Sequence, residues 1–186
     1  PFALLGAGTN VLVRDGGIRG IVCRLGPAMG RIEVDHVSHR MSVQAGALLR
    51  QVSLRAAESG ISGMEWAVGI PGNVGGAVFM NAGAHGGTMA DVVVSVTTLT
   101  CQCEFRTWQV SELAFGYRES ALQGTGDIVL EATLQLEPGS REAIERRHQE
   151  ILESRRQAQP LDLPSAGSVF KRPPGDYAGR LIEAAG

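Results

Sequence analysis

The chain has 186 residues, a hydrophobic content of 44%, a charged content of 19% and a formal net charge of -2. This length suits one large domain or two small ones, and the balanced charge gives no electrostatic support for nucleic-acid binding. No run of about eighteen apolar residues occurs, so a membrane-spanning segment is not expected. The three cysteines follow neither a disulfide nor a metal-site spacing, which favours a reducing compartment and predicts no metal site.

The first part of the chain is expected to consist mainly of strands. The pattern predicts a buried strand over 2–5, a sharp turn over 6–10, short strands over 11–13 and 20–25, and a hairpin joining 31–37 to 40–45. A helix over 47–59 follows, because the apolar residues recur at helical spacing and Gly60 suits the position after a helix end.

The segment Gly69–Gly87, GIPGNVGGAVFMNAGAHGG, is unusually dense in glycine. Each glycine loses more backbone freedom on folding than any other residue, so the density needs a reason. One reason is a ligand that approaches the backbone closely, with amide N–H groups around Gly72, Gly75 and Gly76 lining an anion-binding concavity. The alternative is a turn-rich corner of a β fold. We favour a wall of a site for a phosphate-bearing cofactor.

The second half predicts paired strands over 92–100 and 102–110 and a strong strand over 127–136. A charged helix over 141–158 follows, capped by Ser140 and stopped by Pro160, and a last helix covers 178–185. Because strands are grouped with strands, the fold class is α+β. The turn Gly6–Asn10 has Val11 where a dinucleotide-binding fingerprint needs its third glycine, which argues against a Rossmann fold.

Two positions could carry chemistry. Arg118 is permanently charged and donates in a fixed fork that could clamp a carboxylate or stabilise an enolate. Ser168 has no histidine near it in the sequence, which makes a nucleophile poorly supported but leaves a proton donor open. On position alone, a surface arginine in a turn is the favoured interpretation of Arg118, and the alternative for Ser168 is a turn serine that bonds to its own backbone.

Four motifs in this order, GAGTNVLV, GIPGNVGGAVFMNAGAHGG, FGYRES and QPLDLPSAGSVFKRPPGDYAGRLIEAAG, resemble the UDP-N-acetylenolpyruvoylglucosamine reductase (UDP-N-acetylmuramate dehydrogenase) family. The resemblance spans nearly the whole chain. It implies an FAD-binding fold of two α+β subdomains, like that of the vanillyl-alcohol oxidase superfamily, with the start of a third, substrate-binding subdomain. On this basis 1–22 belongs to the first FAD-binding subdomain, 23–138 forms the second, and 139–186 is a linker helix with the start of the third.

The resemblance also implies an activity, in which NADPH supplies electrons through bound FAD to the enolpyruvyl group of a UDP-sugar for peptidoglycan synthesis. Arg118 matches the catalytic arginine of the family and Ser168 its proton donor. Tyr117, Lys171 and Arg172 match positions at the substrate, although some members have asparagine in place of Arg172. The implied FAD-binding residues are Gly6, Ala7, Gly8, Thr9, Asn10, Val11, Gly69, Ile70, Pro71, Gly72, Asn73, Val74, Gly75, Gly76, Asn81, Ala82 and Gly83.

The family has a third catalytic residue, a glutamate beyond the region matched here, and strands ahead of the first glycine loop. We therefore expect a fragment that lacks both termini, with weak FAD retention and little turnover at this length. A bacterial cytoplasmic location is expected, with no nucleic-acid, membrane or obligate protein partner. The alternatives are another FAD oxidoreductase of the same superfamily and a catalytically silent nucleotide-binding domain.

Overall fold

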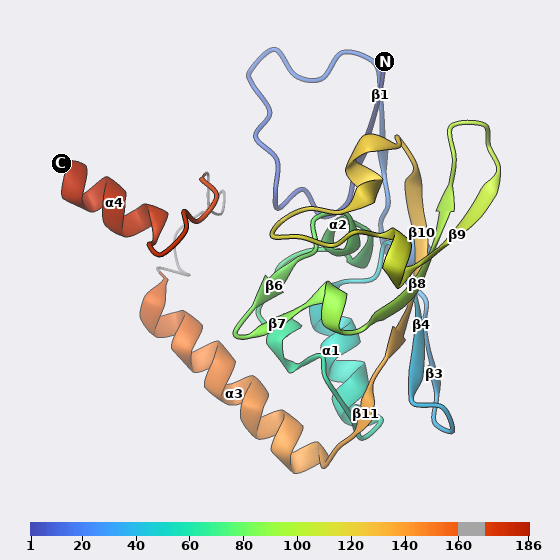
Figure 1. The fold of residues 1–186 in the computed structure, drawn as a ribbon, viewed down its shortest axis with the longest axis vertical. Helices are drawn as coiled ribbons and strands as arrows, with labels where there is room; N and C mark the ends of the chain where they lie inside the picture. Colours follow the sequence, from blue (N-terminus) through green and yellow to red (C-terminus); the bar gives the residue numbers. More distant parts are fainter. Residues whose placement is uncertain (160–169) are drawn as a thin grey trace.

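The computed structural model describes residues 1–159 and 170–186 (Figure 1). In this part of the chain strands mostly follow strands, two α-helices lie among them, and two more come after the last strand. The α+β class expected from the sequence is confirmed. None of the helices among the described residues combines the length and the apolar character that a membrane span requires.

A five-stranded antiparallel sheet with the strand order β3-β4-β10-β8-β9 forms the centre of the fold. Ala132 of the central strand pairs with Val43 on one side and with Val96 on the other, and all three side chains are buried. Successive side chains of a strand point to opposite faces, so this register places the apolar residues on one face. The strands are β3 (Ile32–Asp35), β4 (Arg40–Gln44), β8 (Val93–Leu99), β9 (Phe105–Gln109) and β10 (Ile128–Gln135).

Helices α1 (Leu49–Glu58) and α2 (Val74–Phe79) pack on the buried face of this sheet (Figure 1). The apolar stripe predicted for α1 is confirmed except at its start, where Leu48 is 40% exposed. Gly60 follows α1 with a φ of +66°, the left-handed conformation expected after a helix end.

The sequence did not predict helix α2, because it contains two adjacent glycines, which disfavour helices. The packing explains one of them. A Cβ atom on Gly75 would lie 2.9 Å from the Cβ atom of Ala45, just after strand β4. Tertiary contact therefore overrides local propensity here, and the glycine segment contains a helix rather than loop alone.

A small parallel ribbon of β1 (Phe2–Leu5) and β2 (Ile21–Arg24) lies at the N-terminal end, joined by the long loop over 6–20 (Figure 1). The strand predicted over 11–13 is wrong, because these residues have no strand pairing and are exposed. The prediction of a buried first strand is also wrong, since β1 is at most half-buried and Phe2 is 57% exposed.

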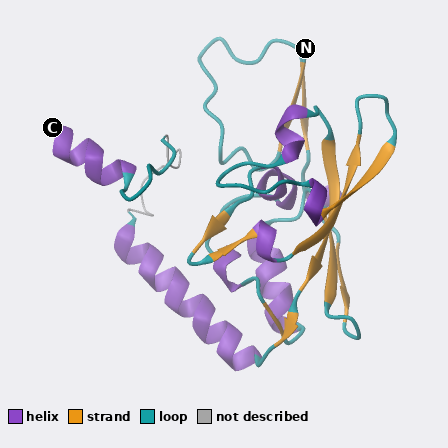
Figure 2. Cartoon of the chain, viewed as in Figure 1, coloured by secondary structure: helices purple, strands orange, loops and turns teal. Residues whose placement is uncertain are grey.

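Helix α3 (Arg141–Ala158) has the predicted bounds, and its N-cap Ser140 accepts a hydrogen bond from the Ala143 amide at 3.4 Å. It lies along one side of the domain, and α4 (Ala178–Ala185) forms the last element (Figure 2). Two short antiparallel ribbons complete the fold, one pairing β5 (Ile61–Ser62) with β11 (Glu137–Pro138) and one pairing β6 (Gly83–Ala84) with β7 (Gly87–Thr88).

Candidate functional site

The loop Gly6–Asn10 lies directly against the start of the glycine segment. A Cβ atom on Gly6 would be 3.0 Å from the Oδ1 atom of Asn73, and one on Gly72 would be 3.6 Å from the Oγ1 atom of Thr9. The two glycine loops that the sequence analysis singled out are distant in the chain, and the structure brings them together.

Asn73, in the glycine segment, is buried where this segment meets the loop Gly6–Asn10. Its Nδ2 atom donates to the Gly46 carbonyl, whereas its Oδ1 atom is buried and has no hydrogen-bond partner among the described residues. A buried acceptor without a partner is costly, and such an atom often marks the place of a missing ligand or water. The orphaned oxygen therefore points to a bound group between the loops.

The sequence analysis expected backbone amides of the glycine segment to line an anion-binding concavity, and their hydrogen bonds correct part of this expectation. The Val74 amide donates to the Ala47 carbonyl at 2.9 Å, and the Gly75 amide donates to the Ala45 carbonyl at 2.9 Å. These N–H groups are satisfied inside the protein. Gly76 is exposed, and a Cβ atom there would meet nothing within 4 Å. A ligand could therefore reach the backbone at Gly76, but not along the whole segment.

The surroundings of Asn73 fit a phosphate-bearing cofactor such as the FAD that the sequence resemblance implies. Gly8 has a φ of +76° and, like Gly76, has open space where a side chain would stand. A ligand could approach the backbone closely at both positions. Of the other residues expected at this cofactor, Pro71 and Asn10 are exposed, and Ile70 and Ala7 are half-buried.

The second half of the glycine segment supports Arg118. This residue is the third of a four-residue turn closed by two hydrogen bonds, from the Gly116 amide to the Glu119 carbonyl at 3.0 Å and from the Glu119 amide to the Gly116 carbonyl at 3.3 Å. The guanidinium Nη2 atom donates to the Gly83 carbonyl at 3.0 Å, and Nη1 donates to the Asn81 carbonyl at 3.4 Å. The arginine is thereby held on the glycine segment.

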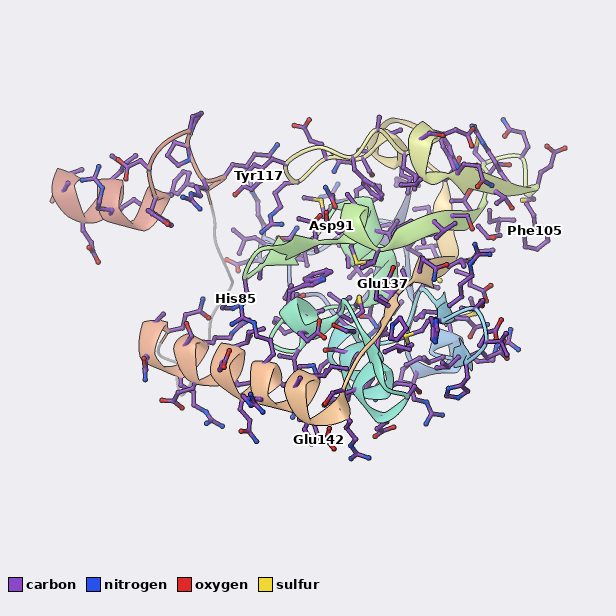
Figure 3. The ribbon with its side chains drawn as sticks, turned by 60° about the horizontal axis from the view of Figure 1, so that its bottom comes forward. His85, Asp91, Phe105, Tyr117, Glu137 and Glu142 are labelled. Atoms are coloured by element: carbon purple, nitrogen blue, oxygen red, sulfur yellow. The ribbon has the colours of Figure 1, made fainter. Side chains whose placement is uncertain are left out.

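Arg118 has a φ of +58°, which is rare for a residue with a long side chain. Such a conformation costs about 1–3 kcal/mol and persists only where the surroundings fix it. Strained residues of this kind cluster at functional sites. Neighbouring Tyr117 is exposed, and Figure 3 shows it on the same side of the molecule as His85, at the tip of the β6–β7 hairpin.

Two residues that the sequence analysis missed also hold this turn. The Ser120 hydroxyl is buried and donates to the Phe79 carbonyl at 2.7 Å. The side-chain Nε2 atom of Gln123 donates to the same carbonyl and to the Arg118 carbonyl, each at 3.1 Å. Nothing in the spacing of these residues indicates the contact, because it depends on how two distant segments fold together.

The C-terminal predictions are only partly described by the structure. Ser168 lies outside the described residues. Lys171 forms an ion pair with Glu119 at 3.1 Å, so the segment after Ser168 reaches the turn that carries Arg118. The guanidinium of Arg172 stacks 3.9 Å from the ring centroid of Tyr177. The two cations expected at the substrate therefore lie in different surroundings.

Helix α3 contacts the first residue of the glycine segment, away from the half that supports Arg118. Arg155 donates to the Gly69 carbonyl, and the buried His148 Nε2 atom lies 2.8 Å from the Ser53 hydroxyl of α1. That hydroxyl donates to the Met64 carbonyl at 2.7 Å, so the imidazole Nε2–H must donate to Ser53. Burial lowers the pKa of His148, against smaller opposing effects of Glu65 and Glu145.

Comparison with protein families and relatives gives a consistent result. A family model described as an FAD binding domain matches residues 1–107, and the C-terminal domain of UDP-N-acetylenolpyruvoylglucosamine reductase matches residues 159–186. All 186 residues align with such reductases from Clostridium beijerinckii, at 47% identity, and Geobacillus kaustophilus, at 46%. The chain spans 60% of the length of each of these relatives.

Solved structures agree with these relatives. The reductase from Thermus caldophilus matches with a TM-score of 0.87 and 41% identity, over 100% of this chain and 66% of that one. A 6-hydroxy-D-nicotine oxidase from Arthrobacter nicotinovorans matches with a TM-score of 0.55 and 19% identity, over 74% of this chain and 31% of its own, which shows a common fold. The fold class and the family resemblance predicted from the sequence are confirmed.

Proposed function

This chain belongs to the FAD-binding domain family, and we propose that it forms the flavin-binding part of a bacterial, cytoplasmic UDP-N-acetylenolpyruvoylglucosamine reductase. The observation that carries this proposal is the arrangement of the segment Gly69–Gly87. One end meets the loop Gly6–Asn10 around an orphaned buried oxygen, and the other end supports a strained arginine. The same segment therefore supports both the proposed cofactor site and the charged side chain, which lets the protein orient cofactor and substrate together.

FAD, when bound, would supply hydride transfer, with NADPH as the source of electrons. The residues Gly6–Asn10 and Gly69–Gly76 would hold it, with Asn73 offering its free Oδ1 atom as an acceptor. We assign the first FAD-binding subdomain to 1–22, the second to 23–138, and the linker with the start of the substrate subdomain to 139–186. The exposed backbone at Gly8 and Gly76 is where close approach is sterically possible.

Arg118 would stabilise the charge that develops on the substrate. Hydride arriving at one alkene carbon leaves negative charge on the other carbon and on its carboxylate. A guanidinium already fixed by two carbonyl groups needs little reorganisation to meet that charge. Ser168 would then protonate the carbon, and Tyr117, Lys171 and Arg172 would contact the UDP-sugar.

The test uses the full-length protein. Purified protein should carry a flavin absorbance band and oxidise NADPH in the presence of the enolpyruvyl UDP-sugar. Replacing Ser168 with alanine should leave the reduction of the flavin by NADPH intact and slow the reduction of the substrate severely. Arg118→Lys should also damage substrate reduction, because lysine lacks the planar fork. A colourless protein that takes up no FAD would contradict the proposal.

A further inference from the structure

One residue, Asn81, contacts both the turn that carries Arg118 and the guanidinium group itself. Asn81 is 7% exposed and has a φ of +41°, so its own backbone is also in the left-handed region. It comes two residues after the last residue of helix α2, and its backbone amide donates to the Val78 carbonyl at 3.1 Å. Asparagine tolerates this conformation better than other residues with side chains.

The side chain of Asn81 joins three segments of the chain. Its Nδ2 atom donates to the Gly116 carbonyl at 2.9 Å, and its Oδ1 atom accepts from the Ala90 amide at 3.0 Å. Gly116 is the first residue of the turn that carries Arg118. The main-chain carbonyl of the same Asn81 accepts from the guanidinium. A single residue thus holds both the base of the turn and the end of the arginine side chain.

This geometry leaves the Asn81 side chain little capacity for a cofactor. Both of its polar atoms are engaged within the protein, whereas the Oδ1 atom of Asn73, the buried asparagine at the other end of α2, has no partner among the described residues. The two asparagines of one segment therefore differ in what they offer. The Asn73 Oδ1 atom is an acceptor without a partner among the described residues, whereas each polar atom of the Asn81 side chain already has one.

We propose that Asn81 is a positioning residue for Arg118 and not an FAD ligand. The inference rests on the proposed function only for the chemical role of Arg118. Its structural part, that the Asn81 side chain fixes the turn Gly116–Glu119, stands on the hydrogen bonds alone. This assignment replaces the cofactor role that the family resemblance implied for this residue.

Two variants separate the side chain from the backbone. Asn81→Gly removes both side-chain hydrogen bonds but keeps the positive φ without strain. Asn81→Asp keeps the acceptor for Ala90 and places a carboxylate oxygen against the Gly116 carbonyl, where a donor stood. Both variants keep the main-chain carbonyl that the guanidinium contacts. Gln135→Ala is the matched control, because it also removes side-chain hydrogen bonds to the backbone, far from Arg118. The Nε2 atom of Gln135 donates to the Ser38 and Leu136 carbonyls beside the β3–β4 hairpin.

The first readout does not depend on activity. Hydrogen exchange in peptides covering 113–120 should accelerate in Asn81→Gly, while peptides covering 69–76 should exchange as in the parent protein. The control Gln135→Ala should leave both regions unchanged. Unchanged exchange at 113–120 in both Asn81 variants would overturn the inference, whether or not the protein proves to be a reductase.

The second readout divides the reaction into its halves in the full-length protein. FAD affinity and flavin reduction by NADPH should be unchanged, whereas oxidation of the reduced flavin by the enolpyruvyl substrate should slow by about tenfold or more, the scale of a misplaced catalytic group. Adding Asn81→Gly to Arg118→Lys should slow this step little further. A weaker FAD affinity with both half-reactions otherwise normal would make Asn81 a cofactor ligand. A parent protein that binds FAD but never reduces this substrate would refute the proposed function. The hydrogen-exchange experiment would still test whether Asn81 positions the turn.

Discussion

The segment Gly69–Gly87 and the loop Gly6–Asn10 are both rich in glycine and contact each other, yet the protein supports them differently. The first is part of the hydrophobic core, because Val74 and Val78 are fully buried and so is Met89, two residues after its end. The second projects from a two-stranded ribbon, and Thr9 and Asn10 are exposed. The comparison shows that glycine density alone does not identify ligand contact.

The glycines of these two segments include two contrasting groups. At Gly75, Gly83 and Gly87 an added Cβ atom would clash with the protein at 2.9 Å or less. At Gly8 and Gly76 it would meet nothing within 4 Å. The first group is required by internal packing, and the second group leaves room for a ligand. The following substitutions test this division.

Gly87→Ala should give the largest loss of stability. An added Cβ atom would lie 2.3 Å from Cδ1 and 2.5 Å from Cγ of Trp66, a buried ring whose Nε1 atom donates to the Gly63 carbonyl. Because the ring cannot move without breaking this contact, we expect the free energy of unfolding to fall by about 3 kcal/mol. Urea denaturation measures it. A midpoint equal to that of the parent would show that the hairpin adapts freely.

Gly75→Ala should have the next largest effect. The new methyl group would lie 2.9 Å from the Cβ atom and 3.3 Å from the carbonyl oxygen of Ala45, so α2 must move away from strand β4. Better helix propensity offsets part of this strain, and we expect a net loss of about 2 kcal/mol. The same denaturation experiment applies. A net gain in stability would place Gly75 in the open group.

Gly76→Ala, one residue later, should act in the opposite direction. With open space at this helical position, the substitution should raise the free energy of unfolding of the FAD-free protein by about 0.5–1 kcal/mol. FAD binding, followed by flavin fluorescence, should nevertheless weaken, because the methyl group occupies the space proposed for the cofactor. Gly179→Ala is the control, an open glycine in helix α4. Unchanged FAD affinity in Gly76→Ala would remove this position from the proposed site.

Sequence patterns predicted most of the sheet and helices α1, α3 and α4, because apolar spacing records which face of an element is buried. They failed at α2 and at the strand predicted over 11–13, where packing and exposure decide the outcome. The motifs pointed to Gly6, Asn73 and Arg118. They gave no signal for Ser120 or Gln123, whose hydrogen bonds form only when distant segments meet. Nor could they separate the two glycine groups, since the distinction lies in the neighbouring atoms.

The smallest expected effect concerns pH and the side of the glycine segment that α3 holds. Burial lowers the pKa of His148 below the unfolded value of 6.5, so the folded state favours the neutral imidazole. The contribution of neutral His148 is fully present above pH 6.5 and is lost as the pH falls below that value toward the folded pKa. The facing carboxylates of Glu65 and Glu145 reduce this loss without reversing it.

Replacing His148 with glutamine isolates this contribution. A glutamine amide can still donate to the Ser53 hydroxyl but does not titrate, so the free energy of unfolding of His148→Gln should fall less between pH 8 and pH 5 than that of the parent. Hydrogen exchange should show where the parent loosens. We expect acid to accelerate exchange at Met64–Gly69, which α3 fastens through His148 and Arg155, and to leave the loop Gly6–Asn10 unaffected. Parallel pH profiles for the two proteins would mean that protonation of His148 does not weaken the contact of α3 with this segment, which Arg155 would then maintain.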